Sequence, residues 1–157
     1  MSYTHLFDYV EGDLVWKNPH KKAQRFKGRI AGCINSDGYR QIRINSGFFL
    51  AHNIIWEMHY GAIPDGYFVD HADTNTLNNS LSNLRLATAS QNQHNKNRQV
   101  NNTSGVKGVT WHKGKWQVQI GHKNKQRKYG RFDDLELATL VAAEVRAKLH
   151  GEFANDG

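Results

Sequence analysis

The sequence predicts an α+β fold made of two small modules. Short apolar runs separated by Gly, Asn and Asp are typical of antiparallel strands, and they dominate residues 6–50 and 106–132. Apolar residues at helical spacing instead occupy residues 51–60 and 134–150. We therefore expect a small antiparallel sheet and a strand–strand–helix unit in the first module. The second module should be a three-stranded antiparallel sheet packed on one helix.

The boundary between the modules is expected in a polar linker. Residues 93–105 are rich in Asn and basic residues and show no apolar periodicity. Such a stretch is typical of a helix end followed by a linker. We therefore divide the chain into residues 1–100 and 101–157, with the boundary near 101–104.

The charge of the chain favours a polyanionic partner. Lys and Arg number 21 against 14 Asp and Glu, which gives a net charge of +7 and a pI near 9.6. No run approaches the ~18 apolar residues of a membrane span, and the N-terminus lacks a signal-peptide pattern, so we expect the protein to stay in the cytoplasm where it is made. Cys33 is the only cysteine, which excludes an intrachain disulfide and a cysteine zinc site.

The N-terminal module begins with short strands. Residues 14–16, 28–34, 39–44 and 48–50 are strand-like, and Asp37-Gly38 is a turn signal. Basic residues in or beside the longest loop suit phosphate contacts or a solvated loop equally well: Lys17, Lys21, Lys22, Arg25, Lys27 and Arg29.

Residues 51–60 change to helical spacing and should brace the segment that follows. Their apolar stripe consists of Ala51, Ile54, Ile55 and Met58. We expect His52, which lies near this stripe, to be structural or exposed. A place in the active site is the less favoured alternative for His52.

The candidate catalytic groups lie in residues 67–97, which read as strand, polar loop, strand and helix. Asp70 and His71 stand where the first strand opens into the loop. Asn92 falls in the first turn of the helix. Polar residues of the loop are expected to form turns, and the helix N-cap is Thr88 or Ser90.

These groups suit metal-assisted hydrolysis of a phosphodiester. A carboxylate and an amide oxygen, from Asp70 and Asn92, favour one Mg²⁺ or Mn²⁺ ion over zinc. A histidine side chain has a pKa of about 6.5 in water, so His71 can take a proton from the attacking water. His94 and His52 are the alternative bases. The competing interpretation, that these residues are independent turn formers, does not explain their spacing.

Three short motifs, Asp70-His71, Asn83-Leu84 and Ser90-x-Asn92, resemble the HNH nucleases. The resemblance implies a ββα-metal unit. It also assigns roles: His71 as the general base, Asp70 and Asn92 as metal ligands, and Asn83 as the asparagine whose carbonyl orients the histidine ring and holds the loop.

The C-terminal module shows three strand-like segments, residues 106–112, 116–120 and 127–132, and a helix capped by Asp133 or Asp134. The apolar positions of the helix are Ala138, Val141, Ala142, Val145 and Leu149.

The middle strand has two different faces. Trp116, Val118 and Ile120 should meet the helix, whereas Gln117 and Gln119 share the other face. A polar, basic face of this kind can lie in a DNA major groove, where glutamine pairs with adenine. An ordinary solvated sheet face explains the pattern equally well.

The stretch SGVKGVTWHKGKWQVQI, followed by KYGRF and an alanine-rich helix, is similar to the AP2 DNA-binding domain that occurs fused to HNH nucleases. Plant AP2 domains have arginine where Thr110 and Gly121 stand and glutamate where Gln119 stands, so their base preference does not carry over. The resemblance implies these DNA-facing residues: Lys107, Thr110, His112, Gln117, Gln119 and Lys128.

Together these patterns predict an HNH endonuclease of the homing or phage type that acts on double-stranded DNA. We expect a monomer or weak dimer with no small-molecule cofactor. The alternatives are a DNA-binding regulator with an idle nuclease centre and an RNA-binding protein.

Overall fold

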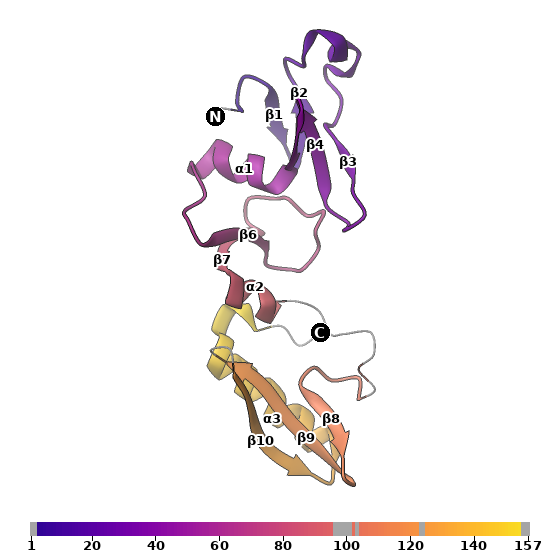
Figure 1. Cartoon of the computed structure of the whole chain (residues 1–157), viewed down its shortest axis with the longest axis vertical. Helices are drawn as coiled ribbons and strands as arrows, with labels where there is room; N and C mark the ends of the chain where they lie inside the picture. Colours follow the sequence, from indigo (N-terminus) through magenta and orange to yellow (C-terminus); the bar gives the residue numbers. More distant parts are fainter. Residues whose placement is uncertain (1–2, 96–101, 103, 123–124, 155–157) are drawn as a thin grey trace. The chain divides into compact units, whose positions relative to one another are not determined.

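The structure is a computed structural model (Figure 1), and the residues that it describes are 3–95, 102, 104–122 and 125–154. The chain divides into two compact units, Met1–Ala87 and Thr88–Gly157. Several small antiparallel sheets and few helices make this an α+β protein, which confirms the predicted fold class at that level. The expected boundary near residue 101 falls outside the described residues, so the module bounds stay a prediction.

The first unit opens with two small sheets. Strands β1 (Phe7–Val10) and β2 (Asp13–Trp16) form an antiparallel hairpin. After the 3-10 helix η1 (Lys21–Phe26), a three-stranded antiparallel sheet follows in the order β3-β4-β5. Its strands are β3 (Cys33–Ile34), β4 (Arg40–Ile44) and β5 (Gly47–Leu50).

Two strand predictions in this region were incomplete. The strand β1 was missed, although Glu11 and Gly12 turn the chain back into β2 with positive φ angles. The strand expected over residues 28–34 pairs with β4 only at Cys33–Ile34, and Ile30 makes one isolated bridge to Val15. The Asp37-Gly38 turn is confirmed.

Helix α1 (Ala51–Tyr60) buries the predicted apolar stripe. Ala51, Ile54 and Ile55 are almost fully buried in a core that includes Leu14 and Ile42 from the sheets. Burial of such side chains contributes on the order of 2 kcal/mol each, so the helix is held firmly on the sheets.

Strands β6 (Tyr67–His71) and β7 (Leu84–Thr88) form a two-stranded sheet, and the polar loop connects them. Val69 and Leu84 are buried in the same core as α1. The strand end that carries Asp70 and His71 is therefore fixed on the hydrophobic core of the first unit.

The second unit contains helix α2 (Ala89–Asn95), a three-stranded sheet, helix α3 (Leu135–His150) and the 3-10 helix η2 (Gly151–Phe153). The antiparallel strands are β8 (Val109–His112), β9 (Lys115–His122) and β10 (Lys125–Phe132), with β9 in the centre.

The packing of this unit follows the predicted pattern. Val118 and Ile120 of β9 are buried against Ala138 and Ala142 of α3. Asp134 caps α3, because its carboxylate accepts a hydrogen bond from the Leu137 N–H at 2.8 Å. The sheet-on-helix arrangement is thus present, and the likeness to AP2 domains stays a prediction. No helix of the described residues is long and apolar enough to cross a membrane.

Candidate active site

Asp70 and His71 end strand β6 as buried polar residues, with 6% and 4% of their surface exposed. Burying a carboxylate beside an imidazole costs free energy unless polar partners compensate. The structure gives a partner to each of them.

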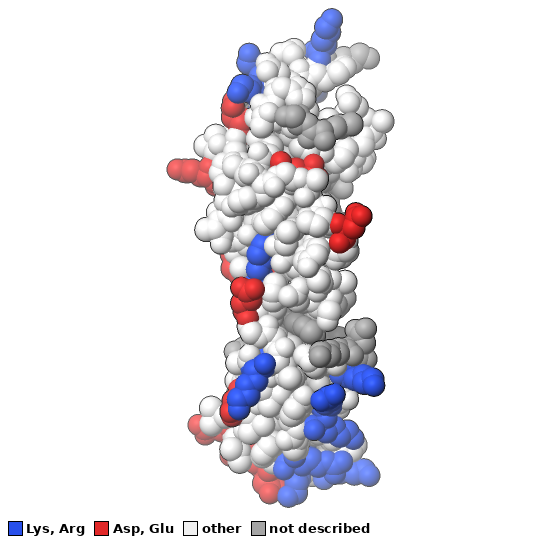
Figure 2. All heavy atoms as spheres, turned by 90° about the vertical axis from the view of Figure 1, so that its left-hand side faces the viewer, with Lys and Arg blue, Asp and Glu red and all other residues white. Residues whose placement is uncertain are grey.

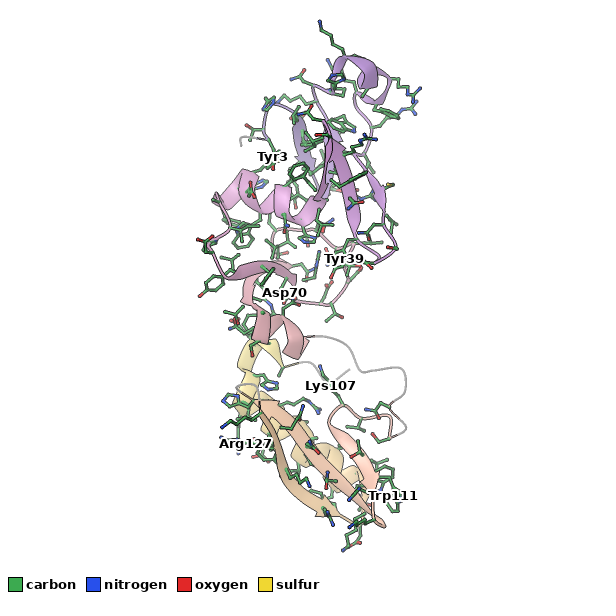
Figure 3. The ribbon with its side chains drawn as sticks, viewed as in Figure 1. Tyr3, Tyr39, Asp70, Lys107, Trp111 and Arg127 are labelled. Carbon is green, nitrogen blue, oxygen red and sulfur yellow. The ribbon has the colours of Figure 1, made fainter. Side chains whose placement is uncertain are left out.

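Asp70 is paired with a cation from the neighbouring strand. The Arg85 Nε, on β7, donates to Asp70 Oδ2 at 3.0 Å. A positive charge therefore already lies on the carboxylate that was predicted to bind metal. Asp70 is labelled in Figure 3.

The His71 ring is held by Asn79. Its Nε2 lies 2.9 Å from Oδ1 of Asn79, which is 2% exposed. An amide oxygen only accepts, so the ring nitrogen is the donor in this contact, and the hydrogen bond fixes the orientation of the ring. The amide that contacts this ring belongs to Asn79, and the orienting role expected of Asn83 stays a prediction. The sequence indicates only a turn former at Asn79, because burial is not visible in a polar run of residues.

Asn83 instead holds the loop between β6 and β7. Its Oδ1 accepts from the Asp73 N–H at 3.0 Å, and its Nδ2 donates to the Asp73 carboxylate at 2.9 Å and to the Asn78 carbonyl at 2.8 Å. Burial raises the pKa of Asp73, but hydrogen bonds from Asn78, Asn75 and Asn83 outweigh it and lower the pKa below its ordinary value. The charged Asp73 thus ties the loop together.

Two aromatic side chains from other elements flank His71. The His52 ring, on α1, lies 4.9 Å from the His71 ring and nearly perpendicular to it, and Tyr39, just before β4, lies 5.4 Å from His52 and 6.1 Å from His71. Tyr39 is labelled in Figure 3. Burial, and then the neighbouring His71, lower the pKa of His52 to about 4, so His52 is uncharged at neutral pH. His52 is thus buried beside His71, a position that suits a structural role and a place in the candidate active site alike.

Asn92 belongs to helix α2 of the second unit. Thr88 caps this helix, since its N–H donates to Gln91 Oε1 at 2.8 Å while its Oγ1 accepts from the Gln91 N–H at 3.3 Å. This capping box places Asn92 in the next helical position after Gln91. The assignment of Asn92 as a metal ligand stays a prediction.

The chemistry of the donor set fits a sparse oxygen site. Among the described residues, no group of three or more His, Cys, Asp and Glu side chains could hold a metal ion. A divalent ion on Asp70 would thus need amide and phosphate oxygens to complete its coordination, as Mg²⁺ does when it binds with a phosphate substrate.

Most residues expected to face DNA share the outer face of the β8–β9–β10 sheet. Thr110 pairs with Gln117, and Lys128 pairs with Gln119. Directly opposed residues project to the same face, so these four lie together on the side away from α3. Arg131, which pairs with Gln117, adds a cation that the sequence pattern did not single out. The sequence pattern did not reveal this position, because a β-bulge between Lys128 and Gly130 shifts the pairing of β10 with β9.

Gln117 departs from the expected exposure. It is only 6% exposed, and its Nε2 donates to Gln119 Oε1 at 3.2 Å. Gln119 is therefore the more accessible of the two glutamines, and Gln117 supports it. His112 is exposed at the end of β8, and the partly buried Lys107, labelled in Figure 3, precedes that strand.

The net positive charge is concentrated in the second unit. Residues 1–87 contain 9 Lys and Arg against 8 Asp and Glu, a net of +1, whereas residues 88–157 contain 12 against 6, a net of +6. Figure 2 shows many Lys and Arg side chains on the surface of this unit. The first unit, which contains Asp70 and His71, is close to neutral.

Comparisons with known proteins identify the segment around Asp70 and His71. Residues 49–94 match the family model for HNH endonucleases. Protein 3.8 of Escherichia phage T7 is 40% identical over 105 residues, which cover 66% of this chain and 86% of that protein.

Two further relatives cover less of the chain. The uncharacterized HNH endonuclease L560 of Acanthamoeba polyphaga mimivirus is 34% identical over 94 residues, 60% of this chain and 49% of that protein. The uncharacterized gene 5.3 protein of Enterobacteria phage T3 is 40% identical over 60 residues, 30% of this chain and 59% of that protein. No solved structure matches the chain.

Proposed function

Because the chain belongs to the family of phage T7 Protein 3.8 and carries an HNH endonuclease domain, we propose that it is a metal-dependent endonuclease of the homing or phage type. Its substrate is double-stranded DNA. The observation that carries this proposal is the buried Asp70-His71 pair at the end of β6, with the His71 ring fixed by Asn79.

His71 acts as the general base. With its ring held by Asn79, the neutral imidazole takes the proton from the attacking water. His52 does not repel the imidazolium formed in this step, because His52 is uncharged at neutral pH. Proton transfer by a positioned histidine contributes typically 10²–10⁴-fold to a rate.

Asp70 would hold the divalent ion, Mg²⁺ or Mn²⁺, and Asn92 is the predicted second ligand. When bound, such an ion stabilises the negative charge that develops on the scissile phosphate and on the leaving oxygen. The hydrogen bonds between Asn83 and Asp73 hold the loop that follows β6 in one conformation. They thereby help to fix Asp70 and His71 at the end of that strand.

The function itself is tested on supercoiled plasmid DNA and on RNA of similar length, each with Mg²⁺ or Mn²⁺. We expect nicked or linear plasmid and intact RNA, measured by gel electrophoresis. DNA that surrounds the protein's own gene serves as a second substrate. Binding of these DNAs without any cleavage would favour the DNA-binding regulator, and cleavage or binding of RNA alone would favour the RNA-binding protein.

The second unit anchors the enzyme on DNA, in keeping with its net charge of +6. Replacing both Lys128 and Arg131 by alanine should weaken binding to a random-sequence duplex. The slope of log affinity against log salt should become shallower by about 0.9 for each phosphate that the variant no longer neutralises. Fluorescence anisotropy over a range of salt concentrations measures both quantities.

The matched control is Lys148→Ala, which removes an exposed cation from α3 of the same unit. Its affinity and salt slope should stay close to those of the wild type. If the double variant keeps the wild-type slope, the outer face of the sheet does not contact phosphates.

A further inference from the structure

We propose that Arg85 is the counter-ion of Asp70 in the metal-free protein and that it thereby sets the affinity of the site for a divalent ion. This inference rests on the proposed metal-dependent function. Arg85 is then a positioning residue, since it acts through the carboxylate of Asp70.

The burial of this ion pair sets it apart from the others of the described residues. The side chains of Arg85 and Asp70 are 19% and 7% exposed, whereas those of Lys17 and Asp8 are 49% and 53% exposed. Exposed pairs are screened by solvent and contribute little. The buried Asp70 carboxylate, in contrast, is shielded from water and is stabilised more strongly by a neighbouring positive charge.

The geometry makes Arg85 and a divalent ion compete for one group. The Arg85 Nε occupies Asp70 Oδ2 at 3.0 Å, from the strand that pairs with β6. An ion bound to the same carboxylate would lie within a few ångströms of the guanidinium. Two positive charges at that separation repel strongly in a site shielded from water. The ion must therefore overcome this repulsion or move Arg85 aside.

The same contact explains how Asp70 stays in place before metal and DNA arrive. Loss of the Arg85 charge would remove a hydrogen-bonded positive partner from a buried carboxylate, which is destabilising. Arg85 thus stabilises the empty site and weakens metal binding. Metal and protein stability are linked, because a ligand that binds only the folded state raises its stability.

The test compares the full-length wild type with Arg85→Met, which keeps most of the side-chain volume and removes the charge. The Kd for Mn²⁺ alone, measured by calorimetry, should fall by about tenfold in the variant. In EDTA the Tm of the variant should drop on the order of 10 °C. Saturating Mn²⁺ should restore much of this loss and should raise the Tm of the wild type less.

The matched control is Arg40→Met. Arg40 forms a partly buried pair with Asp13 in the same unit, at 3.5 Å. Whatever its Tm, this control should bind Mn²⁺ with the affinity of the wild type. A double variant, Arg85→Met with Asp70→Asn, removes both charges. Its Tm in EDTA should exceed that of Arg85→Met, and it should bind Mn²⁺ weakly.

The outcomes separate two kinds of failure. Equal Mn²⁺ affinity in the wild type and Arg85→Met would overturn the proposed competition while leaving the metal site intact. No Mn²⁺ binding by either protein would overturn the metal site and the role of Arg85 together. If Arg85→Met is unfolded in EDTA, Mn²⁺ should refold it, as followed by circular dichroism. A variant that stays unfolded in saturating Mn²⁺ would also contradict the proposal.

Discussion

Replacing His71 by alanine is expected to slow DNA cleavage by roughly 10²–10⁴-fold, the usual contribution of a general base. The affinity for DNA should barely change, because the imidazole is buried at the end of β6 and most of the net positive charge lies in the second unit. Single-turnover nicking measures the rate, and a gel shift measures the affinity. If the protein is a DNA-binding regulator with an idle centre, the wild type and the variant should both bind DNA and neither should nick it.

The control for this variant is His5→Ala, which removes an exposed histidine from the same unit. It should cut DNA at the wild-type rate. If His71→Ala also cuts at that rate, the imidazole is structural or another base acts. Slow DNA cleavage by His52→Ala would then identify His52, whose ring contacts that of His71, as the general base. The side chain of His94, the other alternative base, lies outside the described residues.

The local parts of the fold could be predicted because they depend on short-range spacing. The stripe of α1 and the alternation of Val118 and Ile120 in β9 both follow from periodicity, and both are buried as expected. The strand β1 was missed because it becomes a strand only through its pairing with β2. Such pairing is a tertiary effect that a run of four residues does not reveal.

The candidate site could be predicted as a set of residue types, but the contacts among those residues could not. The sequence predicts that Asp70 and His71 stand at the end of a strand. It does not predict which side chain contacts the His71 ring. Asn79 and Asn83 lie in the same polar loop, and both suit a turn or a hydrogen bond to a ring. Only the folded loop shows that Asn83 bonds to Asp73 and that Asn79 reaches the histidine.

The place of His52 illustrates the same limit. In the sequence, His52 lies near the apolar stripe of α1. That position suits a core histidine and an active-site residue equally well. Tyr39, His52 and His71 come from three separate elements and meet only through the packing of α1 on the sheets. No local pattern in the sequence predicts that these three rings lie together.

Replacing Asp70 by asparagine is expected to reduce DNA cleavage on the order of 10³-fold at a fixed Mg²⁺ concentration. A bound metal ion supplies several kcal/mol of charge stabilisation in the transition state, and each 1.36 kcal/mol corresponds to tenfold in rate. The wild type in EDTA should lose activity in the same way. Asp65→Asn, a change of an exposed carboxylate in the same unit, should leave the rate unaffected.

The response to metal separates this variant from His71→Ala. An asparagine side chain keeps one oxygen ligand, so raising the Mn²⁺ concentration should restore part of the activity of Asp70→Asn. The same addition should not help His71→Ala, because that variant lacks a proton acceptor and still binds metal. Undiminished cutting by the wild type in EDTA would remove the metal from the mechanism. Rescue of both variants by Mn²⁺ would instead show that Asp70 and His71 are both metal ligands. Added metal restores activity only where the substitution has weakened metal binding.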